Sequence, residues 1–137
     1  MSVALDQLIP HRAPMQWITA LTNCTETTAT ATTCFGENDF ALADGKVLET
    51  ALVECVAQTV AAALGQRAQA GGGKSGAAAN GMLVAVSNFK IQFRPPAGKI
   101  LHIEVREVRR LGLMLLVAGI ILCEGQTVAT GELSLYA

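Results

Sequence analysis

The chain has little charge, and the charge that it carries is balanced in sign. Charged residues make up 15% of its 137 residues, with ten Lys and Arg against eleven Asp and Glu and a formal net charge of -1. No overall electrostatic field would therefore draw the chain to nucleic acid or to an anionic membrane. Hydrophobic residues reach 51%, which predicts that part of the surface is buried again in a dimer or a higher oligomer.

Motifs for metals, membranes and export are missing as well. The four cysteines, at positions 24, 34, 55 and 123, show no Cys-x-x-Cys spacing, so we expect no metal site, and nothing in the sequence requires a cofactor. The longest apolar stretch, residues 111–122, is shorter than the ~20 residues of a membrane-spanning helix. The first residues lack the basic-then-apolar pattern of a signal peptide, so we expect a cytoplasmic protein with reduced cysteines.

Length and hydrophobic periodicity predict a single α+β domain spanning residues 1–137. A chain of this length can bury one hydrophobic core but hardly two. Alternating and β-branched patterns predict six strands, at residues 16–21, 25–35, 82–92, 100–110, 113–123 and 126–136. We expect the first two strands to form a hairpin and the last four to form an antiparallel meander, in one sheet that wraps around a helix.

The helix is predicted at about residues 46–68, between a loop at 38–45 and a Gly- and Ala-rich connection at 69–81. Asp44 is a candidate N-cap for this helix, because its side chain can accept hydrogen bonds from the first N–H groups. The helix is apolar nearly all round, which is typical of a helix buried in a core.

Glu54 is the residue of this helix that most needs an explanation. A carboxylate in an apolar helix must be paired, hydrogen bonded or neutral, because burying a bare charge is costly. Gln58 follows four residues later and lies on the same helix face, so a carboxyl group and an amide can line one pocket. Two interpretations stay open: a carboxyl group that faces a substrate, or a buried polar network that fixes the register of a dimer.

The two histidines differ in their setting. His102 shares strand parity with Glu104 and Arg106, so we expect it to face solvent. His11 lies between two prolines, where a stiff backbone can aim a side chain. It is the better imidazole candidate for catalysis, and the alternative is that it braces the N-terminal turn.

Basic residues on the predicted sheet and its turns open a further possibility. They are Lys90, Arg94, Lys99, Arg109 and Arg110. Their charges could bind the phosphates of coenzyme A or an acidic carrier protein. Solvated strand edges are the more common reason for such charges.

Four motifs carry a family resemblance. They are residues 10–15 (Pro-His-Arg-Ala-Pro-Met), 52–58 (Leu-Val-Glu-Cys-Val-Ala-Gln), 89–98 (Phe-Lys-Ile-Gln-Phe-Arg-Pro-Pro-Ala-Gly) and 125–131 (Gly-Gln-Thr-Val-Ala-Thr-Gly). In order and spacing they resemble the hotdog-fold 3-hydroxyacyl-acyl-carrier-protein dehydratases, and most of all the dehydratase-like proteins of aryl-polyene biosynthesis. The resemblance implies a sheet wrapped around one central helix, and a dimer with an acyl tunnel along its interface.

The resemblance also implies an activity. The family removes water from a 3-hydroxyacyl thioester, here carried on an acyl carrier protein or coenzyme A, to give the 2-enoyl thioester in fatty-acid or polyene-type biosynthesis. In the fatty-acid enzyme, a histidine in a His-Phe-Pro-Gly stretch just before the helix works with the helix glutamate. The corresponding stretch, residues 40–45, contains no histidine. Either His11 supplies the imidazole, or the chain has lost dehydration and serves as a binding or partner subunit.

As an enzyme, the chain would use His11 to take the C2 proton and protonated Glu54 to donate to the departing C3 hydroxyl. Backbone N–H groups near Gly45, beside Asp44 at the expected helix N-terminus, would stabilise the enolate-like thioester oxygen. Gln58 would orient the substrate or the carboxyl group.

Two other functions remain open at this point. One is an acyl thioesterase, in which Glu54 would activate water or the thioester carbonyl. The other is a non-catalytic hotdog subunit that pairs with an active dehydratase in a heteromer.

Overall fold

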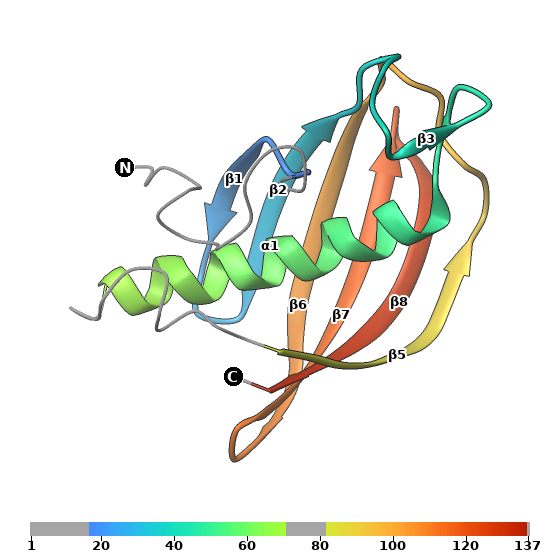
Figure 1. Cartoon of the computed structure of the whole chain (residues 1–137). Helices are drawn as coiled ribbons and strands as arrows, with labels where there is room; N and C mark the ends of the chain where they lie inside the picture. The colour runs from blue at the N-terminus through green and yellow to red at the C-terminus, as the bar shows by residue number, and fades with distance from the viewer. Residues whose placement is uncertain (1–16, 71–81, 137) are drawn as a thin grey trace.

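The computed structural model describes residues 17–70 and 82–136, and within them one helix packs on a large antiparallel sheet (Figure 1). In chain order the elements are β1 (Ala20–Cys24), β2 (Thr28–Cys34), β3 (Leu42–Ala43), β4 (Lys46–Val47), α1 (Glu49–Ala70), β5 (Met82–Ile91), β6 (Ile100–Leu111), β7 (Met114–Cys123) and β8 (Gln126–Tyr136). The sequence predicted a connection at residues 69–81. Its first two residues belong to the end of α1, and residues 71–81 lie outside the described part of the chain.

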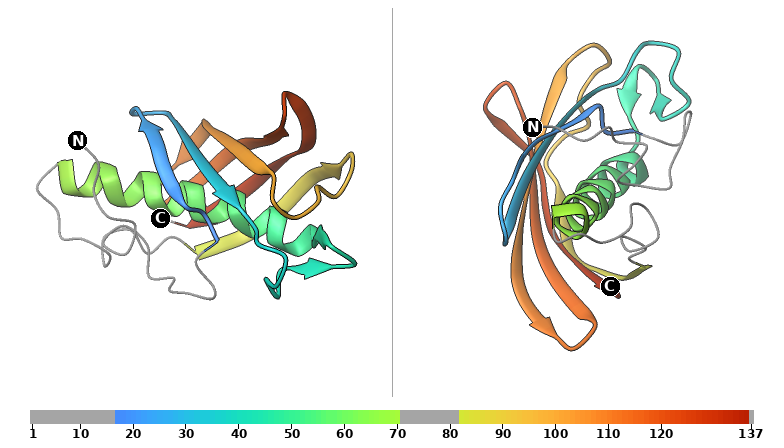
Figure 2. Two further views of the ribbon diagram at one scale, coloured as in Figure 1. Left: turned by 90° about the horizontal axis from the view of Figure 1, so that it is seen from above. Right: turned by 90° about the vertical axis from the view of Figure 1, so that its left-hand side faces the viewer.

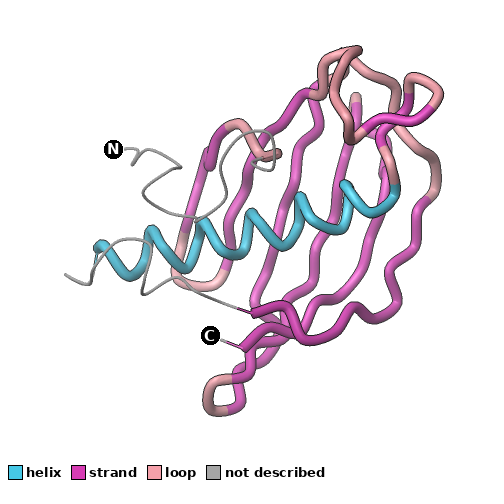
Figure 3. Tube along the Cα trace, in the orientation of Figure 1, coloured by secondary structure: helices cyan, strands magenta, loops and turns pink. Residues whose placement is uncertain are grey.

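Six strands form one sheet in the order β1-β2-β6-β7-β8-β5, and all neighbours in it are antiparallel. Helix α1 runs across one face of this sheet (Figure 1). The right panel of Figure 2 looks along the helix and shows the sheet curving around one side of α1. Figure 3, in the orientation of Figure 1, shows the helix crossing the long strands of the sheet. This is the hotdog architecture, which confirms the α+β fold and the initial hairpin expected from the sequence.

The core lies between the sheet and α1. Residues of β6 are buried and exposed in turn from Ile100 to Arg106, as a strand with one face on a core requires. His102 falls on the exposed face, as its parity predicted. Of the α1 residues whose side chains are described, only Glu49 and Thr50 are exposed, so the sheet buries the helix as its apolar sequence indicated.

The order of the strands differs from the expected meander. Strand β5 does not pair with β6; it lies at one edge of the sheet beside β8, and β2 takes the place beside β6. Only β6, β7 and β8 form a meander. Local periodicity defines each strand but not its neighbour, because pairing is decided when the strands pack on the helix.

A short hairpin precedes α1 where the sequence predicted a loop. Strands β3 and β4 pair through two residues each, and Asp44 and Gly45 form the turn between them with φ angles of 55° and 73°. Positive φ at both positions is what a type I′ turn requires, and Asp-Gly is a strong sequence signal for it. Helix α1 then begins at Glu49. The expectation that Asp44 caps the helix is therefore wrong.

Arg94 fixes this hairpin to the segment that follows β5. Its Nε donates to the carbonyl of Val47 over 2.9 Å, and its Nη2 donates to those of Ala43 and Lys46 over 2.7 and 2.9 Å. The planar fork of a guanidinium suits several carbonyls at once. The Nε and Nη2 groups of Arg94 are thus used within the fold, where they hold the stretch that leads into α1.

Strand β7 passes very close to α1 at Gly119. A Cβ atom on this glycine would lie 2.6 Å from Cγ1 of Val56, far inside van der Waals contact. The missing side chain therefore sets how near the sheet approaches the helix turn that carries Glu54 and Gln58.

Candidate active site

Glu54 lies in the second turn of α1 and is partly buried. Gln58, one turn later, is completely buried. Its amide nitrogen Nε2 donates to Oε2 of Glu54 over 3.2 Å. The two side chains thus share a helix face, as their spacing predicted, and the hydrogen bond limits the orientations open to the carboxyl group.

The oxygen of the same amide holds the N-terminal segment. Oε1 of Gln58 accepts hydrogen bonds from the backbone N–H groups of Trp17, over 2.8 Å, and Ile18, over 3.3 Å. The carbonyl of Trp17 in turn accepts a hydrogen bond from the hydroxyl of Thr33 on β2. One buried amide therefore connects Glu54 to a segment about 40 positions earlier in the chain.

Three aromatic rings meet beside this network. The ring centroid of Trp17 lies 6.3 Å from that of Phe35 and 6.0 Å from that of Phe40, both in edge-to-face geometry. Phe35 is buried, whereas Phe40 is 54% exposed, although Phe40 belongs to the stretch that leads into α1. One exposed apolar ring, that of Phe40, thus lies next to this network.

Cys55 is adjacent to Glu54 but is not a nucleophile. Burial raises the pKa of its thiol far above the ordinary value, and the neighbouring charge of Glu54 raises it further. A thiol is reactive only as the thiolate. Cys55 therefore acts as a packing residue of the core.

Asp44 and Gly45 lie in the exposed turn of the β3–β4 hairpin. The carbonyl of Gly45 accepts a hydrogen bond of 3.0 Å from the N–H of Ala97, which ties the turn to the β5–β6 connection. Because α1 begins at Glu49, the backbone near Gly45 does not form the helix N-terminus, and that expectation is wrong. A role of these two residues in substrate binding stays a prediction.

His11 lies outside the described residues, so its proposed role also stays a prediction.

Sequence reasoning missed Trp17, Phe35 and Phe40. The available signal was their rarity, since the chain has one Trp and four Phe; large aromatic side chains in a chain poor in them mark packing centres.

Two kinds of feature are absent from the part of the chain that the structure describes. No group of three or more His, Cys, Asp or Glu side chains there is arranged to hold a metal ion. Nor is its helix long and apolar enough to cross a membrane.

Solved structures with a similar fold include dehydratases and thioesterases. The dehydratase heterocomplex ApeI:P from Xenorhabdus doucetiae matches with a TM-score of 0.88 and 20% identity, over 99% of this chain and 91% of that one. A hypothetical thioesterase with coenzyme A from Streptococcus pneumoniae TIGR4 matches with a TM-score of 0.65 and 12% identity, over 85% of each chain. Thioesterase superfamily member 2 from Mus musculus gives 0.68 and 12%, over 89% and 83%. At these identities the likeness shows a shared hotdog fold.

The sequence itself is more specific. No curated protein matches it, but the family model of the ApeP dehydratase, ApeP-like, matches residues 3–137. That match spans nearly the whole chain, including the helix with Glu54 and Gln58. The chain belongs to the ApeP-like dehydratase family.

Proposed function

We propose that the chain removes water from a 3-hydroxyacyl thioester carried on an acyl carrier protein, in the biosynthesis of a fatty-acid or polyene-type chain. The observation that carries this proposal is the carboxyl group of Glu54, held by Gln58 on the central helix of a member of a dehydratase family. A positioned carboxyl group on an apolar helix is suited to proton transfer. Such a substrate would be met in the cytoplasm.

Two proton transfers complete the reaction. A base takes a proton from C2 of the acyl chain, and an acid donates a proton to the C3 hydroxyl, which leaves as water while the C2–C3 double bond forms. In the proposal His11 is the base, because imidazole titrates near neutral pH. Glu54 is the acid, and Gln58 keeps its carboxyl group oriented.

Chain length is compatible with a meeting of these two residues. Six positions separate His11 from Trp17, and an extended chain spans at most ~3.5 Å per residue, so the two Cα atoms stay within roughly 20 Å. Trp17 is anchored by its N–H to Gln58, the residue that also binds Glu54. The anchor therefore limits how far His11 can lie from the carboxyl group.

The open edge of the sheet supports a paired assembly. Strand β5 is the last strand on its side, and within the described residues no strand pairs with its outer edge. Val84 and Val86 on this strand are 54% and 44% exposed. An exposed apolar edge is a template for a further strand, so we propose that a second hotdog subunit, identical or different, pairs here.

A second function has a specific observation in its favour. Residues 40–45, which lead into α1, contain no histidine, and a similar solved structure is a dehydratase heterocomplex. The chain could thus be a non-catalytic subunit that completes an active partner. A thioesterase has less support, because the thioesterase structures share the fold alone.

Mass spectrometry of a 3-hydroxyacyl carrier-protein thioester incubated with the purified chain tests the proposal. We expect a loss of about 18 Da, the mass of water, in the wild-type sample, and a rate that falls ~10²–10⁴-fold in Glu54→Gln and in His11→Ala. Glu54→Gln keeps an oxygen that can accept from Gln58, so the fold should persist. Glu49→Gln, an exposed position in the first turn of the same helix, is the matched control and should keep full activity.

The alternatives give different results. Free thiol instead of the unsaturated thioester would indicate a thioesterase. No reaction by the chain alone, together with an unchanged rate of a reconstituted heteromer when Glu54→Gln is introduced, would indicate a non-catalytic subunit.

A further inference from the structure

Strand β7 is apolar on both of its faces, unlike the strands beside it. Its inward side chains, among them Leu115, Val117 and Ile121, are buried against α1. Its outward side chains, on the face of the sheet away from α1, are Leu116, Ala118, Ile120 and Leu122. We call this side the outer face. Strands that are apolar on both faces are normally covered on both faces. Within the described residues the outward side chains of β7 are only half-buried, and α1 covers the opposite face of the strand.

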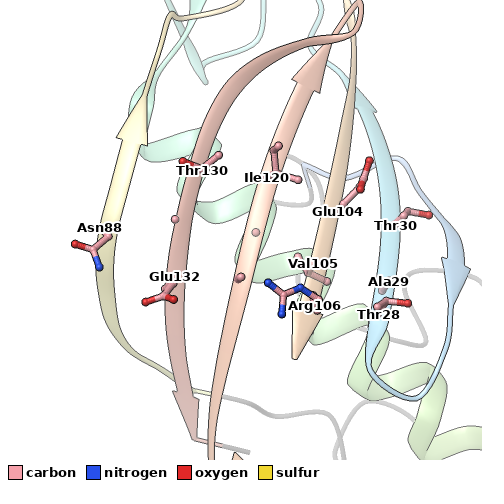
Figure 4. A pocket seen from close by; sticks show the side chains of 13 residues that line it. Thr28, Ala29, Thr30, Asn88, Glu104, Val105, Arg106, Ile120, Thr130 and Glu132 are labelled. Carbon is pink, nitrogen blue, oxygen red and sulfur yellow. The ribbon is translucent and has the colours of Figure 1, made fainter. Parts of the chain in front are cut away.

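Charged residues flank this apolar stripe in register. Across the sheet Arg106 of β6 pairs with Ala118 of β7, and Ala118 pairs with Glu132 of β8. Arg106 and Glu132 therefore stand one strand to either side of the stripe at the same height. Figure 4 views the outer face, with α1 behind the sheet and both labelled side chains on the near side.

The next row repeats the balance of charge. Glu104 pairs with Ile120, Ile120 with Thr130, and Thr130 with Lys90 of β5. Together the two rows carry two positive and two negative side chains around small and apolar residues. A surface of this kind has no preference for a polyanion or a polycation, and Arg106 and Glu132, which lie at equal distances from β7, can complement each other between two copies.

The outer face is also hollowed between these side chains. A hollow of about 660 Å³ spans the two rows, and its floor includes Ala118 and Gly119 on β7. A second hollow of about 320 Å³ continues toward the β6–β7 turn and is lined by Leu111, Met114 and Leu116. An apolar stripe at the base of an open hollow favours a protein cover over bulk water.

We infer that the outer face binds the outer face of a second copy of this chain, with a two-fold axis that runs parallel to β7. Rotation by 180° about this axis places β6 of one copy opposite β8 of the other. It leaves each residue at the same position along the strand direction. Arg106 of each copy then faces Glu132 of the other, and the stripes of β7 meet on the axis. Two sheets pack about 10 Å apart with nearly aligned strands, a gap that Arg and Glu side chains span.

This contact is independent of the chemistry proposed for Glu54 and of the β5 edge. A two-fold contact at the outer face joins two copies of the chain, each alone or with a different subunit at its β5 edge. Loss of the outer-face contact should therefore separate the two copies, halve the mass of the assembly and leave edge pairing intact.

Charge reversal followed by complementation tests the inference in sedimentation experiments. In the Arg106→Glu variant a glutamate would face Glu132 of the other copy, and in the Glu132→Arg variant an arginine would face Arg106 of the other copy. Because like charges repel across the axis, each variant should run at half the wild-type mass. An equimolar mixture of the two variants should regain the wild-type mass, because every pair across the axis is then of opposite charge. Glu26→Arg, an exposed residue in the β1–β2 turn, is the matched charge reversal and should leave the mass unchanged.

Far-UV circular dichroism verifies that each variant folds. Unchanged mass in both folded variants would overturn the inference, and so would a mixture that stays at half mass. A wild-type chain that runs at the half mass by itself, and enlarges only when a different protein is added, would assign the outer face to that protein and equally overturn it.

Discussion

Gln58 donates a hydrogen bond of 3.2 Å from its amide nitrogen to the carboxyl group of Glu54, one helix turn earlier. The same buried amide accepts two backbone hydrogen bonds from the N-terminal segment. Its position is therefore fixed from both ends. A carboxyl group that is held in this way can act at a defined point of a substrate, which a flexible surface glutamate cannot.

Gln58→Met should destabilise the fold and slow dehydration. The change keeps the side-chain length but leaves the N–H groups of Trp17 and Ile18 without their acceptor, at a cost of about 1–3 kcal/mol in the free energy of unfolding. Urea denaturation followed by the fluorescence of Trp17, the single tryptophan, measures it. Gln126→Met, an exposed position at the start of β8, is the control, and an equal loss in both variants would contradict the role given to Gln58.

Gly119→Ala should lower stability because the new Cβ would meet Cγ1 of Val56 at 2.6 Å. Forced overlap in a packed core typically costs about 1–3 kcal/mol. Combining it with Val56→Ala should cost less than the sum of the two single changes, because the second change removes the clashing atoms. Gly36→Ala, where nothing lies within 4 Å of the added atom, should unfold like the wild type. Simple additivity in thermal or chemical denaturation would contradict the close approach.

Arg94→Lys should loosen the hairpin that leads into α1. A lysine keeps the positive charge but loses the fork that binds three carbonyls. Hydrogen exchange measures this directly, since the amide of Val47 is bonded to Pro95 and that of Leu48 to Ala41. Both amides should exchange faster. Arg109→Lys, at an exposed position, should leave them unchanged, and protection that survives Arg94→Lys would show that the fork is dispensable.

Cys55 should make the protein less stable at alkaline pH. Its pKa is raised in the folded state above an ordinary value of 9.0, so the unfolded chain loses the thiol proton more readily. The stabilisation is complete below about pH 9 and is lost as pH rises beyond it, by about 1.4 kcal/mol at pH 10. The difference in unfolding free energy between wild type and Cys55→Ala should shrink by that amount from pH 8 to pH 10.

A thiol reagent gives an independent measurement of the same burial. At neutral pH the exposed Cys34 should be labelled in the folded protein, whereas the buried Cys55 should be labelled only in denaturant. Rapid labelling of Cys55 in the native state would contradict its placement in the core.

Much of the fold follows from local patterns. The apolar run of α1, the alternation of the long strands and the shared face of Glu54 and Gln58 depend on residues a few positions apart, so the sequence determines them. The β3–β4 hairpin was also within reach, since Asp44-Gly45 is a recognised turn signal. The interpretation of Asp44 as a helix cap was wrong because an aspartate shortly before an apolar run fits a turn as well as a helix cap.

Only the tertiary structure decided the rest. The place of β5 beside β8 and the hydrogen bonds from Trp17 and Ile18 to Gln58 join residues far apart in the chain. Such contacts form when the sheet closes around α1, and no local pattern selects between two apolar edges or between two possible partners for a buried amide. The sequence by itself thus determined the elements and the carboxyl group on the helix. Packing decided which segments meet around that carboxyl group.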